Sequence, residues 1–116
     1  MSRTGWHMTR TDAALVLSRR LPARLDVAAD AAFPPLRRGR LAHMIRQDLW
    51  RMLRDLRGFS PVVRIVRVEG GLHVTAGGAV AGAVPGDTAQ RIAAMLADAG
   101  LKARWLRDAR LPEARA

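Results

Sequence analysis

The sequence contains no cysteine, which excludes a disulfide framework and a thiolate metal site. It also contains no tyrosine and only one lysine, against 19 arginines. No apolar run approaches the roughly 18 residues that a membrane-spanning helix requires. From the missing cysteines and the missing apolar run we expect a protein of the cytoplasm without a membrane span.

Residues suited to catalysis or metal binding are scarce and poorly spaced. The three histidines, His7, His43 and His73, share no spacing such as i, i+4 that would direct two of them at one metal ion. No Ser-His-Asp arrangement is indicated, and no glycine-rich loop ends in the Gly-Lys-Ser/Thr that cradles phosphate. The sequence therefore predicts a protein that is not an enzyme and that uses no cofactor and no metal.

The charge of the chain is unevenly distributed. The 116 residues carry a formal net charge of +10 and are 49% hydrophobic, which is typical of one globular domain. Residues 36–67 contain nine arginines and two aspartates, so this segment alone has a net charge of +7. The basic character is thus concentrated in one predicted helix and the predicted strand that follows it.

The pattern of residues 36–57 predicts a long amphipathic helix, because its apolar side chains fall in one sector at about 100° per residue. That sector contains Leu41, Met44, Ile45, Leu49, Met52, Leu53 and Leu56. The opposite sector contains His43, Arg46, Gln47, Trp50, Arg54 and Arg57, with Arg40 and Arg51 on its flank. A helix that needed only solubility would mix charges there and would not expose an indole.

Three interpretations of this basic helix face remain open. In the first, its arginines contact the phosphates of DNA or RNA while Trp50 stacks on a base or sugar. In the second, the face binds an acidic protein surface, such as that of a nuclease or polymerase, where Trp and Arg are common anchors. In the third, the helix is simply solvated, and the N-terminal segment covers Trp50, for example with Phe33.

We favour the first interpretation, a small basic accessory or regulatory protein that binds nucleic acid. The predicted site comprises Arg40, His43, Arg46, Gln47, Trp50, Arg51, Arg54, Arg57 and Arg64. Arg64 belongs to the predicted strand and extends the basic surface only if its side of the sheet is the solvated one. The surrounding arginines are expected to lower the pKa of His43. Asp48 and Asp55 are each spaced to pair with Arg51, which predicts a row of surface ion pairs.

The remaining segments predict an α+β fold around this helix. We expect a disordered start at residues 1–10, then a short helix over 13–20 and a proline-ended linker within residues 11–35, and a single domain over 36–110. Within that domain, strands at 62–68 and 72–76 form a hairpin, and Gly77-Gly78 turns the chain into a third strand at 79–84. Helices at 89–99 and 101–110 follow, with Gly100 ending the first and Trp105 in the core, before a frayed tail at 111–116.

The predicted order of helix, strands and helix resembles that of double-stranded RNA-binding domains, and a winged-helix arrangement fits it about equally well. The resemblance stops at topology. The second helix offers only Arg91 where RNA-binding domains carry a basic cluster, and the first hairpin turn is too tight to reach into a groove. The sequence therefore predicts no family.

Overall fold

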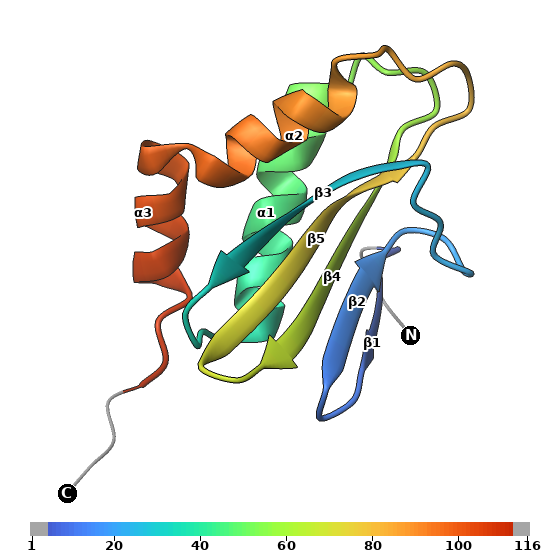
Figure 1. Ribbon diagram of the computed structural model, residues 1–116. Helices are drawn as coiled ribbons and strands as arrows, with labels where there is room; N and C mark the ends of the chain where they lie inside the picture. The colour runs from blue at the N-terminus through green and yellow to red at the C-terminus, as the bar shows by residue number, and fades with distance from the viewer. Residues whose placement is uncertain (1–4, 113–116) are drawn as a thin grey trace, which may run out of the picture.

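The computed structural model describes residues 5–112, which form a five-stranded antiparallel sheet and three helices, an α+β fold (Figure 1). The strands are β1 (His7–Arg10), β2 (Ala14–Ser18), β3 (Val27–Phe33), β4 (Ser60–Val68) and β5 (Gly71–Ala79). The helices are α1 (Arg38–Leu53), α2 (Thr88–Ala97) and α3 (Ala99–Asp108). The strand order in the sheet is β1-β2-β4-β5-β3. The first three strands and the last two therefore belong to one sheet, and the expected division at residue 36 separates no structural unit.

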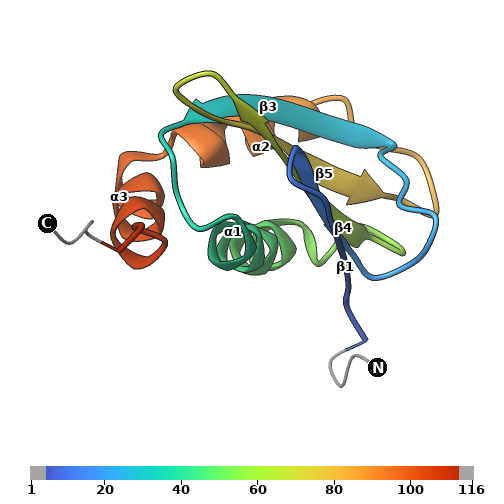
Figure 2. The ribbon, with the colours of Figure 1, turned by 90° about the horizontal axis from the view of Figure 1, so that it is seen from below.

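The molecule has two layers, with the helices on one face of the sheet (Figure 2). α1 packs across β4, β2 and β5, and α2 packs on β3. The alternation of the strands supplies the apolar inner face: Val63, Ile65 and Val74 point towards the helices and are fully buried. No helix within residues 5–112 has the length and apolar character needed to cross a membrane.

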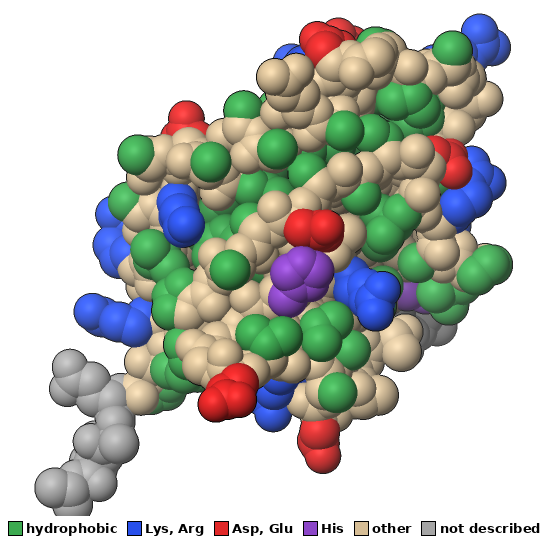
Figure 3. Space-filling view, in the orientation of Figure 1, with side chains coloured by type: hydrophobic (Ala, Val, Ile, Leu, Met, Phe, Trp, Pro, Cys, Tyr) green, Lys and Arg blue, Asp and Glu red, His purple; other side chains and the backbone are tan. Residues whose placement is uncertain are grey.

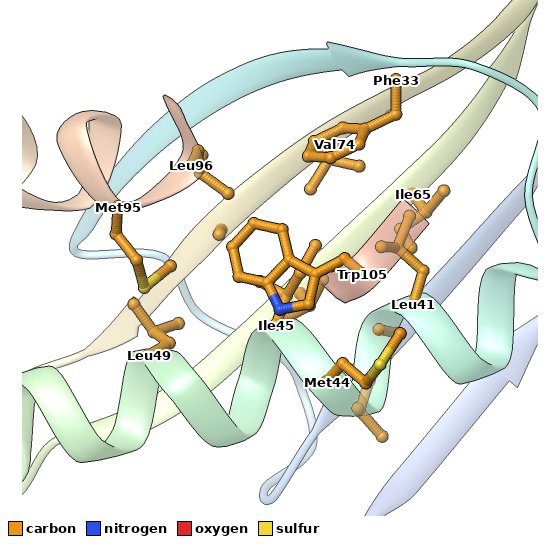
Figure 4. Close-up of a cluster of buried hydrophobic side chains, with 14 of the residues drawn as sticks. Phe33, Leu41, Met44, Ile45, Leu49, Ile65, Val74, Met95, Leu96 and Trp105 are labelled. Atoms are coloured by element: carbon orange, nitrogen blue, oxygen red, sulfur yellow. The ribbon is translucent and has the colours of Figure 1, made fainter. Parts of the chain in front are cut away.

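The core lies between the sheet and α1, and Trp105 of α3 occupies its centre (Figure 4). The indole is fully buried and its ring centroid lies 6.2 Å from that of Phe33. The placement of Trp105 in the core is confirmed. From α1, the side chains that pack into the core are those of the predicted apolar sector, including Leu41, Ile45, Leu49 and Leu53.

The predicted N-terminal helix is wrong, because residues 14–18 form β2. Leu15 and Leu17 alternate with Val16, and both leucines are fully buried opposite Ile65 and Val63 of β4. Thr11 lies in the hairpin turn before β2, where its hydroxyl accepts a hydrogen bond from the Ala14 amide at 3.1 Å. β1 then pairs with β2, so residues 7–10 of the start expected to be disordered are ordered. Residues 1–4 lie outside the described part of the chain.

The predicted linker contains β3, an alanine-rich edge strand that pairs with β5 along its whole length. Gly77 of β5 has no side chain, and the backbone of β3 occupies the space that a Cβ atom would need. A Cβ atom on Gly77 would clash with the carbonyl oxygen of Val27 and with Ala28 in the neighbouring strand. Gly77-Gly78 is therefore part of β5 and makes no turn, and the predicted third strand at 79–84 is wrong: β5 ends at Ala79 and residues 80–87 form a connection.

The long helix is confirmed, with shorter bounds than expected. α1 begins at Arg38 and ends at Leu53, and the chain continues through turns closed by the amides of Leu56 and Phe59. Gly58 ends this segment with a φ of +64°, a conformation that favours glycine. A Cβ atom on Gly58 would also collide with the side chain of Ala81. The expected stop at this glycine is thus present, several residues beyond the end of the helix.

The C-terminal helix pair is also confirmed, with its boundary displaced. Asp98 separates α2 from α3, and its carboxylate accepts a hydrogen bond from the Leu101 amide at 2.9 Å. This is the geometry of an N-cap, so Asp98 starts the second helix. Gly100 lies within the first turn of α3 and does not end α2. Of the predicted tail, residues 113–116 lie outside the described part of the chain.

Asp48 is buried and does not belong to a surface row of ion pairs. Its carboxylate accepts a hydrogen bond from Nε1 of Trp105 at 2.7 Å and another from the guanidinium of Arg104. The predicted i, i+3 ion pair of Asp48 with Arg51 is present, with 3.8 Å between a guanidinium nitrogen and the carboxylate. Asp48 therefore joins α1 to α3 from inside the molecule, while Asp55 is exposed.

We predict that Asp48→Ala lowers the free energy of unfolding by about 2–4 kcal/mol, because it leaves a buried indole N–H and a guanidinium without their acceptor. Urea denaturation measures the loss. The matched control is Asp55→Ala in the exposed turn, for which we expect a change within about 0.5 kcal/mol. Equal stability of the two variants would contradict a structural role for the Asp48 carboxylate.

Candidate functional site

The outer face of α1 carries most of the predicted site. Within the site, the exposed residues on α1 and the turn after it are Arg40, Gln47, Trp50, Arg51, Arg54 and Arg57, and the half-buried ones are His43 and Arg46. Since α3 packs along one flank of α1, these side chains fall into groups with different surroundings. The group on the other flank, towards the ends of β1 and β2, forms a defined hollow.

Trp50 is exposed and held in a fixed orientation. Its side chain is 42% exposed, and its ring lies nearly parallel to that of Phe59, with 6.4 Å between the centroids and 8° between the planes. Phe59 itself is buried. Phe33, the residue expected to cover Trp50 in the solvated-helix interpretation, packs on Trp105 instead. One face of the Trp50 indole is therefore backed by Phe59, and the ring also borders the hollow.

The hollow has a volume of about 410 Å³. Four segments meet there: the residue before β1, the end of β2, the middle of α1 and the turn that leads into β4. Its lining residues are Trp6, Arg19, Arg20, Arg46, Trp50, Gly58, Phe59, Ser60 and Pro61. Within residues 5–112, the lining thus combines two indoles with three arginines and contains no carboxylate.

Two of these arginines lie against one ring. The guanidinium carbon of Arg46 is 4.7 Å from the centroid of Trp6, and that of Arg19 is 5.4 Å from it. Burial lowers the pKa of the Arg46 guanidinium, and the positive charge of Arg19 lowers it further. Nε of Arg46 is buried and has no hydrogen-bond acceptor among the described residues. The hollow therefore holds two neighbouring cations on an aromatic ring, an arrangement that an anion would stabilise.

His43 lies on the same exposed side of α1. Burial lowers the pKa of its imidazole, and the charges of Arg46 and Arg40 lower it further. The direction expected from the sequence is confirmed, although partial burial contributes more than the arginines do. His43 is therefore mainly neutral near pH 7, and a bound anion would favour its protonated form.

Of the residues of the predicted site, Arg46 and Trp50 line the hollow, whereas Arg51 and Arg64 lie on other surfaces of the molecule. Arg51 faces the other flank of α1, where it borders an open groove between α1 and α2 that includes Met52, Arg91 and Met95. Arg64 is exposed on the open face of the sheet, opposite the face that the helices cover, so it does not extend the basic surface of α1. Figure 3 shows this open face, where apolar side chains are mixed with cations, acids and a histidine.

Sequence reasoning missed Trp6, Arg19, Arg20 and Phe59. A recognisable signal existed for the first two. Once 14–18 is assigned as a strand, the pairing of His7 with Ser18 places Trp6 opposite Arg19 by simple continuation of the antiparallel register. The helical interpretation of residues 13–20 concealed that neighbourhood.

Comparison with known proteins returns no match to this chain, whether with protein-family models, with curated protein sequences or with solved structures. Residues 5–112 contain no group of three His, Cys, Asp or Glu side chains able to hold a metal ion. The chemistry of the site therefore has to be inferred from its own cations and aromatic rings.

We predict that His43 titrates below the ordinary histidine value of about 6.5. Because the folded pKa is lowered, the unfolded chain binds the proton first, so stability present above about pH 6.5 is lost as the pH falls through the window below it. The chemical shift of the His43 ring proton, followed against pH and assigned with His43→Gln, measures this pKa. Arg40→Gln should raise it, and a wild-type value at or above 6.5 would contradict the description of the site.

Proposed function

We propose that this protein binds nucleic acid, as a non-enzymatic accessory or regulatory protein of the cytoplasm. The observation that carries the proposal is the hollow beside Trp50, where two indoles and three arginines meet without a carboxylate in the lining. Arginine guanidinium groups bind phosphate, and exposed aromatic rings stack on bases or sugars. The exposed side chains of Arg54 and Arg57 add cations at and beyond the end of α1. Arg40 adds another on the side of α1 that faces α3, where the hydrogen bond from Arg107 lowers the pKa of Asp108 and the charge of Arg40 lowers it further.

The distribution of charge over the molecule supports the same proposal. On the open face of the sheet, cations and acids are mixed: Arg64 shares this face with Asp30 and His73. The lining of the hollow, in contrast, has three arginines and no carboxylate among the described residues, which gives a polyanion a preferred place on the protein.

The second candidate function is binding to an acidic protein surface. Trp50 favours it, because an exposed tryptophan packed on a second aromatic ring is the kind of side chain that dominates protein–protein interfaces. The two candidates differ in what supplies their affinity. Phosphate binding draws affinity from released counterions, whereas a protein interface draws most of it from buried apolar contacts.

We predict that the triple variant Arg40→Glu, Arg54→Glu and Arg57→Glu no longer binds any polynucleotide, since it reverses the exposed cations of the α1 side. Its unfolding free energy should stay within about 0.5 kcal/mol per substitution, because all three side chains are exposed. Fluorescence anisotropy with labelled oligonucleotides and urea denaturation provide the two measurements.

The matched control reverses Arg64, Arg107 and Arg110, which are also exposed but lie on the open face of the sheet and at the end of α3. It changes the net charge of the protein by the same amount. We expect this control to retain most of the affinity. If both variants lose binding equally, net charge alone attracts the polynucleotide and the α1 surface is not the site.

We also predict that the logarithm of the affinity falls linearly with the logarithm of the salt concentration. With roughly four phosphate contacts the slope should be near −3, because each contact releases condensed counterions. Anisotropy titrations over a series of salt concentrations measure this slope. A flat dependence, together with weak binding to every polynucleotide, would favour the acidic protein partner.

A further inference from the structure

The aromatic rings that line the hollow bear on whether its partner is a single or a double strand. Its aromatic wall is Trp50, whose ring is backed by the buried Phe59, and its other indole is Trp6, which lies against Arg46 and Arg19. A ring face can stack only on a flat group that reaches it. The bases of a duplex are covered on both faces by their neighbours, whereas those of a single strand can be splayed out.

The cations of the hollow lie where the backbone of such a strand would pass. Arg19 and Arg20 follow β2, and Arg46 reaches the same space from α1. Arg46 lines the hollow with its guanidinium on the ring of Trp6, so its positive charge lies beside the position that a phosphate would take. The three arginines and the ring of Trp50 border one hollow of about 410 Å³. Such a space fits a single nucleotide better than it fits the side of a double helix.

We infer that the hollow takes one unstacked base of a single-stranded nucleic acid, with the base on the indole of Trp50 and the flanking phosphates on Arg19, Arg20 and Arg46. This inference rests on the proposed function and specifies its ligand. In a duplex, a base must first be unpaired and unstacked before it can make the same contact, and this costs free energy. We therefore expect the protein to bind single strands at least about tenfold more tightly. The exposed arginines of α1 contact both kinds of strand.

Three probes of equal length test the inference: a single-stranded oligothymidylate, the corresponding duplex and a single strand with abasic sites in place of the bases. All three present phosphates, but only the first offers a base that is free to stack. We expect the oligothymidylate to bind most tightly, and the abasic strand to lose the advantage over the duplex. Quenching of tryptophan fluorescence should accompany binding of the oligothymidylate.

The decisive variant is Trp50→Leu, which keeps an apolar side chain over Phe59 and removes the indole. It should lower the affinity for oligothymidylate by about 10- to 100-fold and leave duplex binding nearly unchanged. Trp50→Phe, which retains a ring, should restore part of the preference. Arg54→Gln should weaken single-strand and duplex binding alike, and Arg64→Gln should change neither, because Arg64 lies on the open face of the sheet.

The possible failures are distinguishable. Equal affinity for single strand and duplex, with both lost on charge reversal of α1, overturns the inference and leaves the proposed function standing. A single-strand preference that survives Trp50→Leu also overturns it, since the preference then comes from elsewhere. Failure of the wild-type protein to bind any of the three probes at low salt overturns both the inference and the proposed function.

Discussion

The packing of α1 against α3 depends on the buried carboxylate of Asp48. A carboxylate removed from water costs several kcal/mol unless it is compensated, and here Trp105 and Arg104 of α3 supply the compensation. The hydrogen bond to the indole is local and directional, so it fixes the rotation of α1 relative to α3 as well as their distance. With α3 covering one flank of the helix, the side chains of Arg46 and Trp50 are directed to the other flank, where the hollow forms.

The hollow also explains how cations are held without acidic partners. Arg46 is partly buried beside Arg19, and the two charges repel each other. The face of Trp6 provides attraction in place of a carboxylate, an interaction of about 0.5–2 kcal/mol for a cation on an indole. A carboxylate would neutralise the site, whereas a ring leaves the full positive charge available. An incoming phosphate then gains attraction to both guanidinium groups and relieves their mutual repulsion.

Much of the fold follows from patterns that are local in the sequence, and the part that does not follow depends on distant partners. The sequence alone predicts the amphipathic period of α1, the hairpin of β4 and β5 and the burial of Trp105. It does not predict β2, because five residues, Ala-Leu-Val-Leu-Ser, fit a helix or a strand until β4 provides Val63 and Ile65 opposite its leucines. β3 is rich in alanine, which disfavours strands, and it forms because Gly77 lets its backbone approach β5.

The residues of the candidate site also fall into two groups, those that local spacing predicts and those that depend on distant partners. Arg46 and Trp50 share a helix face, so their neighbourhood could be read from helical spacing alone. Trp6 and Arg19 join them only through the register of β1 on β2, and Arg64 leaves the site because the sheet places it on the opposite face. A pattern within one helix thus predicted two of the nine described lining residues, Arg46 and Trp50, while the presence of Trp6 and Arg19 required knowledge of which strands pair.

The turn after α1 adds a final constraint, since it sets the orientation of the aromatic wall. Gly58 adopts a conformation that other residues disfavour, and it has no room for a side chain beside Ala81. The next residue, Phe59, is buried and lies flat behind Trp50. An indole held in this way loses little conformational entropy when a ligand stacks on it, so more of the stacking energy remains as affinity. The segment that ends the helix therefore also sets the orientation of the aromatic wall of the hollow, and both features depend on Gly58.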